Sequence, residues 1–334
     1  MVTQSLQREE NTMAPKEKKK RRVSVRFQRG LSNSIIYIIL AVMSIVWLLP
    51  IVWLFLQSFS GETGQSGMTE FIPKTWSFNN YLYLFTNKVV SKDGLTIDES
   101  QYNFFAKISK TGVFQMGAFL YTAVIALFTS IIATLFTLAT SYAFSRLRFK
   151  GRTTMMKIIL ILGMFPGFLG LIVLYEIFKL MGLTGTIWAL IIIYSGGAGM
   201  GYYISKGFFD TISKQIDEAA MVDGATRFQI FYKITLPLSR PIVVYTVLTA
   251  FMGPWAEYIT AQYMIRTGAT NGATGGVVTV AVQLFSMLDE KTNRSQYFGQ
   301  FCAGAIIVAV PTSLLFIALQ KNYVSGVTGG AVKG

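Results

Sequence analysis

The chain has 334 residues, of which 52% are hydrophobic and only 14% are charged. Because the apolar residues gather in long runs, this composition excludes an ordinary soluble domain and indicates an integral membrane protein. The sequence has no histidine and one cysteine, Cys302, which excludes imidazole metal sites, Ser-His or Cys-His catalysis and an intrachain disulfide. We therefore predict no catalytic residue and no metal site.

Residues 1–34 form a strongly basic N-terminal tail, and the net charge of the whole chain is +14. Basic runs of this kind also occur in nucleic-acid-binding proteins. A polybasic segment before a first membrane span is, however, a common topology signal, because positive loops stay in the cytoplasm. We predict that this tail is disordered and cytoplasmic, and that nucleic acid is not a partner.

Six hydrophobic spans follow the tail, and each approaches the roughly 20 residues that a bilayer requires. The first span, 35–59, precedes a polar loop, 60–114, that we predict to be extracytoplasmic with aromatic anchors. The anchors are Trp76, Tyr81, Tyr83, Phe104 and Phe105. The other five spans lie in a membrane core, 115–321, and a polar tail, 322–334, ends the chain. These spans are 116–144, 156–180, 187–203, 242–265 and 301–319.

An even number of spans places both termini on one side of the membrane. Most of the 30 Lys and Arg residues fall on that side, so we predict that both termini are cytoplasmic. The loop 205–241 then lies in the cytoplasm, and the loop 266–299 lies outside with an amphipathic stretch at 277–288.

Several residues within the spans have two interpretations. Pro50, Pro166, Pro254 and Pro311 either kink helices in the ordinary way or shape a translocation path. The Gly197-xxx-Gly201 spacing favours close helix packing over a flexible gate. Glu257 is the one candidate for an ionisable group deep in the membrane. With Trp255 and Tyr258 it either faces a translocation path or anchors the helix at the interface.

The loop 205–241 predicts two short helices. A helix from Lys214 to Val222 would end at Gly224 in a left-handed conformation. Thr226 and Gln229 form a capping-box pattern that opens a second helix through Lys233, and Pro237 and Pro241 would end that run. Helices this short are not stable alone, so we expect a cytoplasmic partner. The sequence contains no P-loop that could hydrolyse ATP, so energy must come from another protein.

This loop resembles the EAA loop of permease subunits of bacterial ABC importers. The resemblance is carried by Glu218-Ala219-Ala220, Gly224 and Ile234-x-Leu236-Pro237. Other stretches resemble the carbohydrate branch of that family, which includes the maltose transporter. They are Ser141-Tyr142-Ala143-Phe144-Ser145-Arg146, Gly182-Leu183-Thr184-Gly185-Thr186, the C-terminal ending, and Trp255-Ala256-Glu257-Tyr258, in which Ala256 replaces the usual Asn.

The resemblance implies an all-α integral membrane protein with the six transmembrane helices of the type I ABC importer permease fold. A cytoplasmic coupling helix would lie between spans four and five and dock into an ATPase subunit. The coupling residues would be Glu218, Ala219, Ala220, Asp223, Gly224, Leu236 and Pro237. In the outer loop, the residues that would contact a binding protein are Gly268, Asn271, Gly272, Gly275 and Gly276. The alternative for this segment is a plain flexible loop.

The implied partners are a second, different permease subunit, two ATP-binding cassette subunits, an extracytoplasmic substrate-binding protein and the lipid bilayer. ATP and Mg would be bound by the ATPase partner, and this chain would bind no cofactor. We therefore expect a permease subunit of a sugar importer, with oligosaccharide as substrate, in the bacterial inner membrane. The alternatives are a permease of the same class for another solute, or a channel or membrane enzyme with a helical cytoplasmic loop.

Overall fold

The computed structural model describes residues 16–62, 70–90, 97–108, 112, 114–164, 167–197, 201–266, 277–289 and 291–331. These residues are mostly helical. Their contacts divide the chain into two units, Met1–Phe55 and Leu56–Gly334.

The first unit is dominated by helix α2, which runs from Lys16 to Ser58 and ends just inside the second unit. Its stretch Asn33–Ser58 is long and apolar enough to cross a membrane, and none of the apolar window is buried within the chain. The prediction that the basic tail is disordered is wrong from Lys16 onward. Lys and Arg are good helix formers, and a helix already nucleated by an apolar span extends through them at little cost.

The second unit begins with the segment predicted as a polar loop, which contains regular structure. Helix α4 (Asn79–Thr86) precedes two antiparallel hairpins. These hairpins pair β1 (Lys88–Val90) with β2 (Ile97–Glu99), and β3 (Ala106–Ile108) with β4 (Phe114–Met116). Phe104 is 1% exposed and belongs to the protein core, so it is not a membrane anchor. Trp76 is largely exposed, as an anchor requires.

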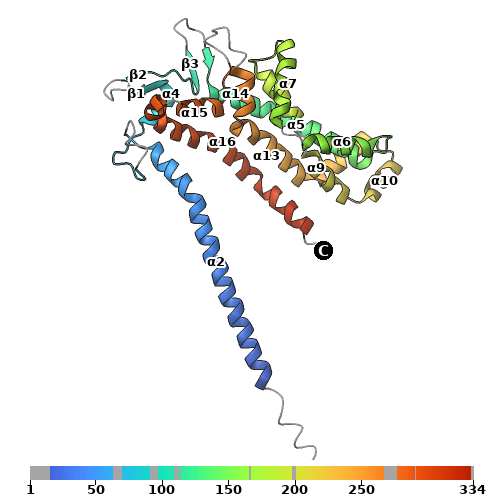
Figure 1. The fold of residues 1–334 in the computed structure, drawn as a ribbon. Helices are drawn as coiled ribbons and strands as arrows, with labels where there is room; N and C mark the ends of the chain where they lie inside the picture. Colours follow the sequence, from blue (N-terminus) through green and yellow to red (C-terminus); the bar gives the residue numbers. More distant parts are fainter. Residues whose placement is uncertain are drawn as a thin grey trace, which may run out of the picture. The chain divides into compact units, whose positions relative to one another are not determined.

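Helix α5 (Ala118–Arg146) is the predicted second span and is unbroken. It packs against α8, α9 and α13, and α13 lies between α5 and α16 (Figure 1). Small and hydroxyl residues such as Ala126, Thr129 and Ala133 are buried along α5, which lets the neighbouring helices approach closely.

The next three predicted spans are interrupted. The third is divided into α6 (Arg152–Gly163) and α7 (Gly167–Leu180), and the fourth into α8 (Ile187–Gly196) and α9 (Gly201–Thr211). The fifth is divided into α13 (Arg240–Ala256) and α14 (Ile259–Arg266). Pro254 lies in the last turn of α13, directly before that break. Pro166 falls outside the described residues.

The glycine spacing in the fourth span does not serve close packing. A β-carbon at Gly201 would meet only a methyl of Thr137, at 3.9 Å, and one at Gly197 would meet only the carbonyl of Ile193 in its own turn. The packing prediction is therefore wrong here. The helix instead ends at Gly196 and resumes at Gly201, with a 44° bend.

The last helices are α15 (Val280–Asp289), within the predicted amphipathic stretch, and α16 (Lys291–Ala331). Helix α16 extends the predicted sixth span in both directions, so the predicted polar tail is helical as far as Ala331. Within the described residues, three single helices are long and apolar enough to span a membrane, or up to five spans if each bent pair counts as one. The six-span topology stays a prediction.

Three backbone hydrogen bonds hold the start of α5 against residues 103–105. The amides of Gly117, Ala118 and Phe119 donate to the carbonyls of Phe105, Asn103 and Phe104, at 2.7, 3.0 and 2.9 Å. A β-carbon at Gly117 would lie 2.5 Å from the backbone of Phe104 and Phe105. Only glycine fits at this contact.

We predict that Gly117→Ala lowers the stability of the protein by about 1–3 kcal/mol, because the added methyl must push two backbones apart. The thermal midpoint of the purified protein in detergent, followed by tryptophan fluorescence, measures this. Gly163→Ala is the control, since a β-carbon there meets nothing within 4 Å. Equal midpoints for the two variants would contradict the prediction.

Candidate functional site

The first part of the site is helix α10, which runs from Lys214 to Val222 as predicted. The Ser213 hydroxyl caps its start by accepting from the amide of Gln215 at 3.3 Å. Gly224 has φ +82°, and the amide of Ala225 donates back to the carbonyl of Ala220 at 2.9 Å. The predicted left-handed helix stop at Gly224 is therefore confirmed.

The second part begins at α11 (Arg227–Gln229) with the predicted capping box. The amide of Gln229 donates to the Thr226 hydroxyl at 3.3 Å, and the amide of Thr226 donates to the Gln229 side chain at 2.8 Å. The chain stays helical beyond the predicted end, through a π-helical segment (Ile230–Thr235) and α12 (Leu236–Leu238).

Pro237 does not end this run, because it lies in the first turn of α12, where a missing amide proton is tolerated. The break comes after Leu238. There the axis turns by 86° into α13, with Pro241 in the first turn of that helix.

The predicted coupling residues form an exposed surface, and we call the residues from Lys214 to Tyr232 the elbow. Within it Glu218, Ala219, Asp223 and Gly224 are exposed, and Ala220 is partly buried. Leu236 is partly buried and Pro237 exposed, just beyond the elbow. Val222 is 87% exposed and Phe228 70% exposed. Large apolar side chains exposed beside a short polar helix are typical of a protein-binding surface.

A buried ion pair, which the sequence analysis did not predict, attaches the elbow to the end of α5. Arg146 Nε, at the end of α5, lies 3.3 Å from Asp217 Oδ2, and the two side chains are only 2% and 7% exposed. Arg146 Nη2 also donates to the carbonyls of Phe209 and Ile212, at 2.9 and 2.8 Å. The contact with Asp217 is ionic without hydrogen-bond geometry, since Nε finds no hydrogen-bond partner.

Other residues of the last turns of α5 hold the neighbouring helices. The Ser145 hydroxyl lies 2.6 Å from Asp210 of α9, which is also paired with Lys206 at 2.5 Å. The Tyr142 hydroxyl donates to the carbonyl of Arg227 at 3.3 Å, and its ring lies 4.8 Å from that of Phe231. The end of α5 therefore contacts α9, α10 and the helices after Gly224.

The three residues predicted for a translocation path have structural contacts. Trp255 is 4% exposed and packs against Phe119, with ring centroids 5.2 Å apart. The Glu257 carboxylate accepts from the amides of Thr260 and Ala261, at 2.9 and 3.2 Å. It therefore caps the start of α14. The Tyr258 ring packs against that of Phe285, with ring centroids 4.2 Å apart and planes tilted by 38°.

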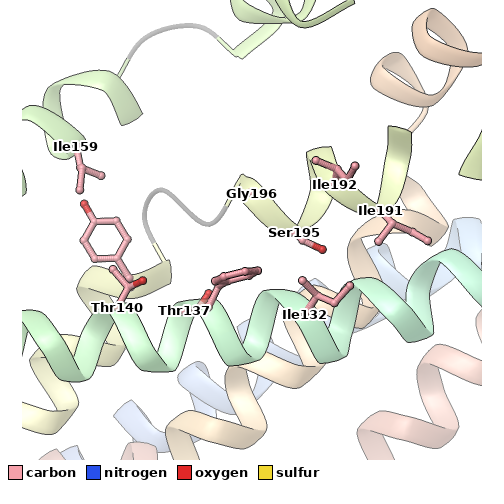
Figure 2. Close-up of a pocket in the computed structure, with 10 residues that line it drawn as sticks. Ile132, Thr137, Thr140, Ile159, Ile191, Ile192, Ser195 and Gly196 are labelled. Carbon is pink, nitrogen blue, oxygen red and sulfur yellow. The ribbon is translucent and has the colours of Figure 1, made fainter. Parts of the chain in front are cut away.

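A cavity of about 510 Å³ lies elsewhere, between α5, α6, α8 and α9 (Figure 2). Among the described residues no charged one lines it, and the hydroxyls of Ser195 and Tyr202 are buried there without a hydrogen-bond partner. Its walls can accommodate a neutral group. The lining residues are Ile132, Phe136, Thr137, Thr140, Ile159, Ile191, Ile192, Ser195, Gly196 and Tyr202.

The predicted contact residues for a binding protein lie outside the described residues. They are Gly268, Asn271, Gly272, Gly275 and Gly276. In the described part of the chain, no group of three or more His, Cys, Asp or Glu residues could hold a metal ion.

We predict that Glu257→Ala destabilises the protein by about 1 kcal/mol, because the first amides of α14 lose their cap. Glu257→Gln should lose less, since one side-chain oxygen can still accept. Thermal midpoints of both variants, with the exposed Glu176→Gln as control, measure the effect. A midpoint for Glu257→Ala equal to that of the control would show that the cap contributes nothing.

A family model described as binding-protein-dependent transport system inner membrane component matches residues 136–328. The galactooligosaccharides transport system permease protein GanQ of Bacillus subtilis (strain 168) is 33% identical over 89% of this chain and 94% of its own. The maltodextrin transport system permease protein MalD of Streptococcus pneumoniae (strain ATCC BAA-255 / R6) is 32% identical over 93% of this chain and 99% of its own.

Among solved structures, one chain of a bacterial ABC transporter involved in the import of the acidic polysaccharide alginate has the same fold. It superimposes with a TM-score of 0.63 at 21% identity, over 92% of this chain and 99% of that one. The fold is thus that of an ABC importer permease. The chain belongs to the family of binding-protein-dependent transport system inner membrane components, and it is a non-catalytic membrane permease subunit of an ABC transporter.

Proposed function

We propose that this permease works in an ATP-driven importer of oligosaccharides, and that the elbow docks an ATPase subunit. The observation that carries the proposal is the exposure of Val222 and Phe228 on an elbow whose Asp217 is paired with the buried Arg146. Two ATPase subunits would bind ATP and Mg, and this chain would bind neither.

The chemistry of the elbow fits insertion into a cleft of a partner. The small side chains of Ala219 and Ala220 keep α10 narrow, and the Glu218 side chain is exposed to solvent. A charge-assisted hydrogen bond from a basic partner group to the Glu218 carboxylate would contribute about 1.5–3 kcal/mol. Gly224 lets the chain turn sharply between α10 and α11, at a positive φ that other side chains rarely adopt. The coupling surface would thus comprise a narrow helix, a sharp turn and two apolar side chains.

The proposed topology has six spans in the bacterial inner membrane, with both termini and the elbow in the cytoplasm. In this arrangement the interrupted spans α6–α7, α8–α9 and α13–α14 each cross the membrane once. A second, different permease subunit would supply the other half of the translocation path.

Oligosaccharides are the proposed substrates, because the relatives GanQ and MalD carry names of galactooligosaccharide and maltodextrin transport. An extracytoplasmic binding protein would deliver the sugar to the outer face. Support for such a partner comes from the family description and from a solved alginate transporter in complex with a periplasmic protein.

We predict that Glu218→Lys abolishes co-purification of an ATPase subunit with the tagged permease and lowers sugar uptake about tenfold or more, a loss of at least 1.4 kcal/mol of coupling. Asp98→Lys is the matched control, because it makes the same charge reversal on the exposed strand β2. Normal co-purification and uptake for Glu218→Lys would contradict docking at the elbow.

Gly224→Asn separates docking from folding at the same surface. A β-carbon at Gly224 meets nothing within 4 Å, and Asn tolerates a left-handed conformation better than most residues. The variant should therefore fold with an unchanged thermal midpoint and lose the ATPase. Retention of the ATPase by this variant would mean that no partner lies close to the turn.

The substrate proposal predicts that cells carrying the complete transport system take up radiolabelled maltotriose or a galactooligosaccharide, and that deletion of this permease stops the uptake. Competition with a tenfold molar excess of unlabelled glucose or galactose should leave it unchanged. Uptake inhibited equally by monosaccharides would argue against oligosaccharides. Loss of ATPase docking with normal uptake would argue against the proposed role of the elbow.

A further inference from the structure

Asp217 is the only buried residue of α10, all of which the structure describes. The other residues of this helix are exposed or partly buried, including Glu218 directly beside it. A nine-residue helix has little stability of its own. The attachment of α10 to the rest of the protein therefore depends heavily on the Asp217 carboxylate.

We infer that Arg146 and Asp217 form a link that makes α10 and the end of α5 move together, with Arg146 and Asp217 as positioning residues. A protein that displaces α10 would thereby displace a membrane helix. The identity of that protein as an ATPase rests on the proposed function, whereas the link is a property of this chain alone.

One guanidinium group joins three helices at this point. Arg146 extends from the last residue of α5, and its Nη2 donates to two carbonyls at the end of α9 while its Nε faces Asp217 of α10. The two backbone hydrogen bonds fix the orientation of the guanidinium plane. Asp217 therefore meets a charge whose position is already set by α5 and α9.

Burial makes the link resist separation. With exposures of 2% and 7%, neither charge can exchange its partner for water unless the local structure opens. Pulling the two apart would leave both charges buried and uncompensated, which costs more than separating an exposed pair. A displacement of α10 is then transmitted to α5, because movement of the helix end costs less than opening the pair.

The pair also has room to tighten. Arg146 Nε and Asp217 Oδ1 are buried without hydrogen-bond partners, so a small approach of α10 would convert the ionic contact at Nε into a charge-assisted hydrogen bond. The arrangement can thus hold α10 at more than one distance without losing the charge contact.

A neighbouring ion pair supplies a matched control. Lys206 and Asp210 are both on α9, and their side chains are 14% and 42% exposed. Neither residue lies on α10, so removal of Lys206 weakens an ion pair near the end of α5 without touching the link. Lys206→Gln should leave the position of α10 unchanged.

The test measures the distance between α5 and α10 with two spin labels. Cys302 is the single native cysteine, and Cys302→Ser removes it. Ala139→Cys and Gln215→Cys then place labels at exposed positions of α5 and α10. The distance is measured by pulsed electron paramagnetic resonance on the full-length permease in lipid nanodiscs. The samples are the permease alone, and the permease with its copurifying subunits in the presence and absence of ATP.

We expect a narrow distance distribution in the parent and in Lys206→Gln. Asp217→Asn, which keeps the shape and removes the charge, should broaden the distribution about twofold, and Asp217→Glu should restore most of the narrowness. In the assembled transporter, Asp217→Asn should keep most ATP hydrolysis and lose about tenfold in sugar transported per ATP. An inert structural role would instead lower both activities in parallel.

An unchanged distance distribution in Asp217→Asn would overturn the inference that this pair links α5 and α10. If Asp217→Asn fails to fold, Arg146→Lys decides instead, because it keeps the charge and loses the two carbonyl bonds of Nη2. A narrow distribution for this variant would then overturn the inference. Absence of any copurifying ATPase would overturn the proposed function, and the distance measurement on the permease alone would still decide the link.

Discussion

The arrangement of the elbow depends on one buried cation, Arg146, at the end of helix α5. A positive side chain at a helix C-terminus is favoured by the helix dipole, and here it also meets two carbonyls of α9 and the carboxylate of Asp217. A charge removed from water must have its partners in place. The ends of three helices are therefore brought to one point, and the exposed elbow is presented to solvent from this point.

The opposite end of α5 is held by different means. There three backbone hydrogen bonds, and the absence of a side chain at Gly117, bring residues 103–105 against the helix start. Helix α5 is thus attached at one end through a charge and at the other through backbone contact. The helices around it are interrupted, which is tolerated in a membrane protein where other groups satisfy the freed backbone. Glu257 does so at the start of α14.

The interruptions and the unbroken α5 suggest different mechanical roles within one fold. A continuous helix of 29 residues carries a displacement along its length, whereas breaks at Gly196–Gly201 and Ala256–Ile259 allow the segments on each side to change direction. The cavity of Figure 2 borders one of these breaks, next to α5.

The sequence alone determined the features that arise from neighbouring residues. It predicted the membrane class, the limits of α10, the left-handed Gly224 and the Thr226–Gln229 capping box, because each depends on local hydrophobicity, backbone preference or a short-range hydrogen bond. Tertiary structure decided which of the adjacent acids, Asp217 or Glu218, faces inward. It also decided that Glu257 caps α14 and that Phe104 is buried in the core. It also divided three apolar spans, since hydropathy averages over a break. The physical reason is that a helix face becomes buried only when distant segments pack against it, and Arg146 selects Asp217 from a position far away in the chain.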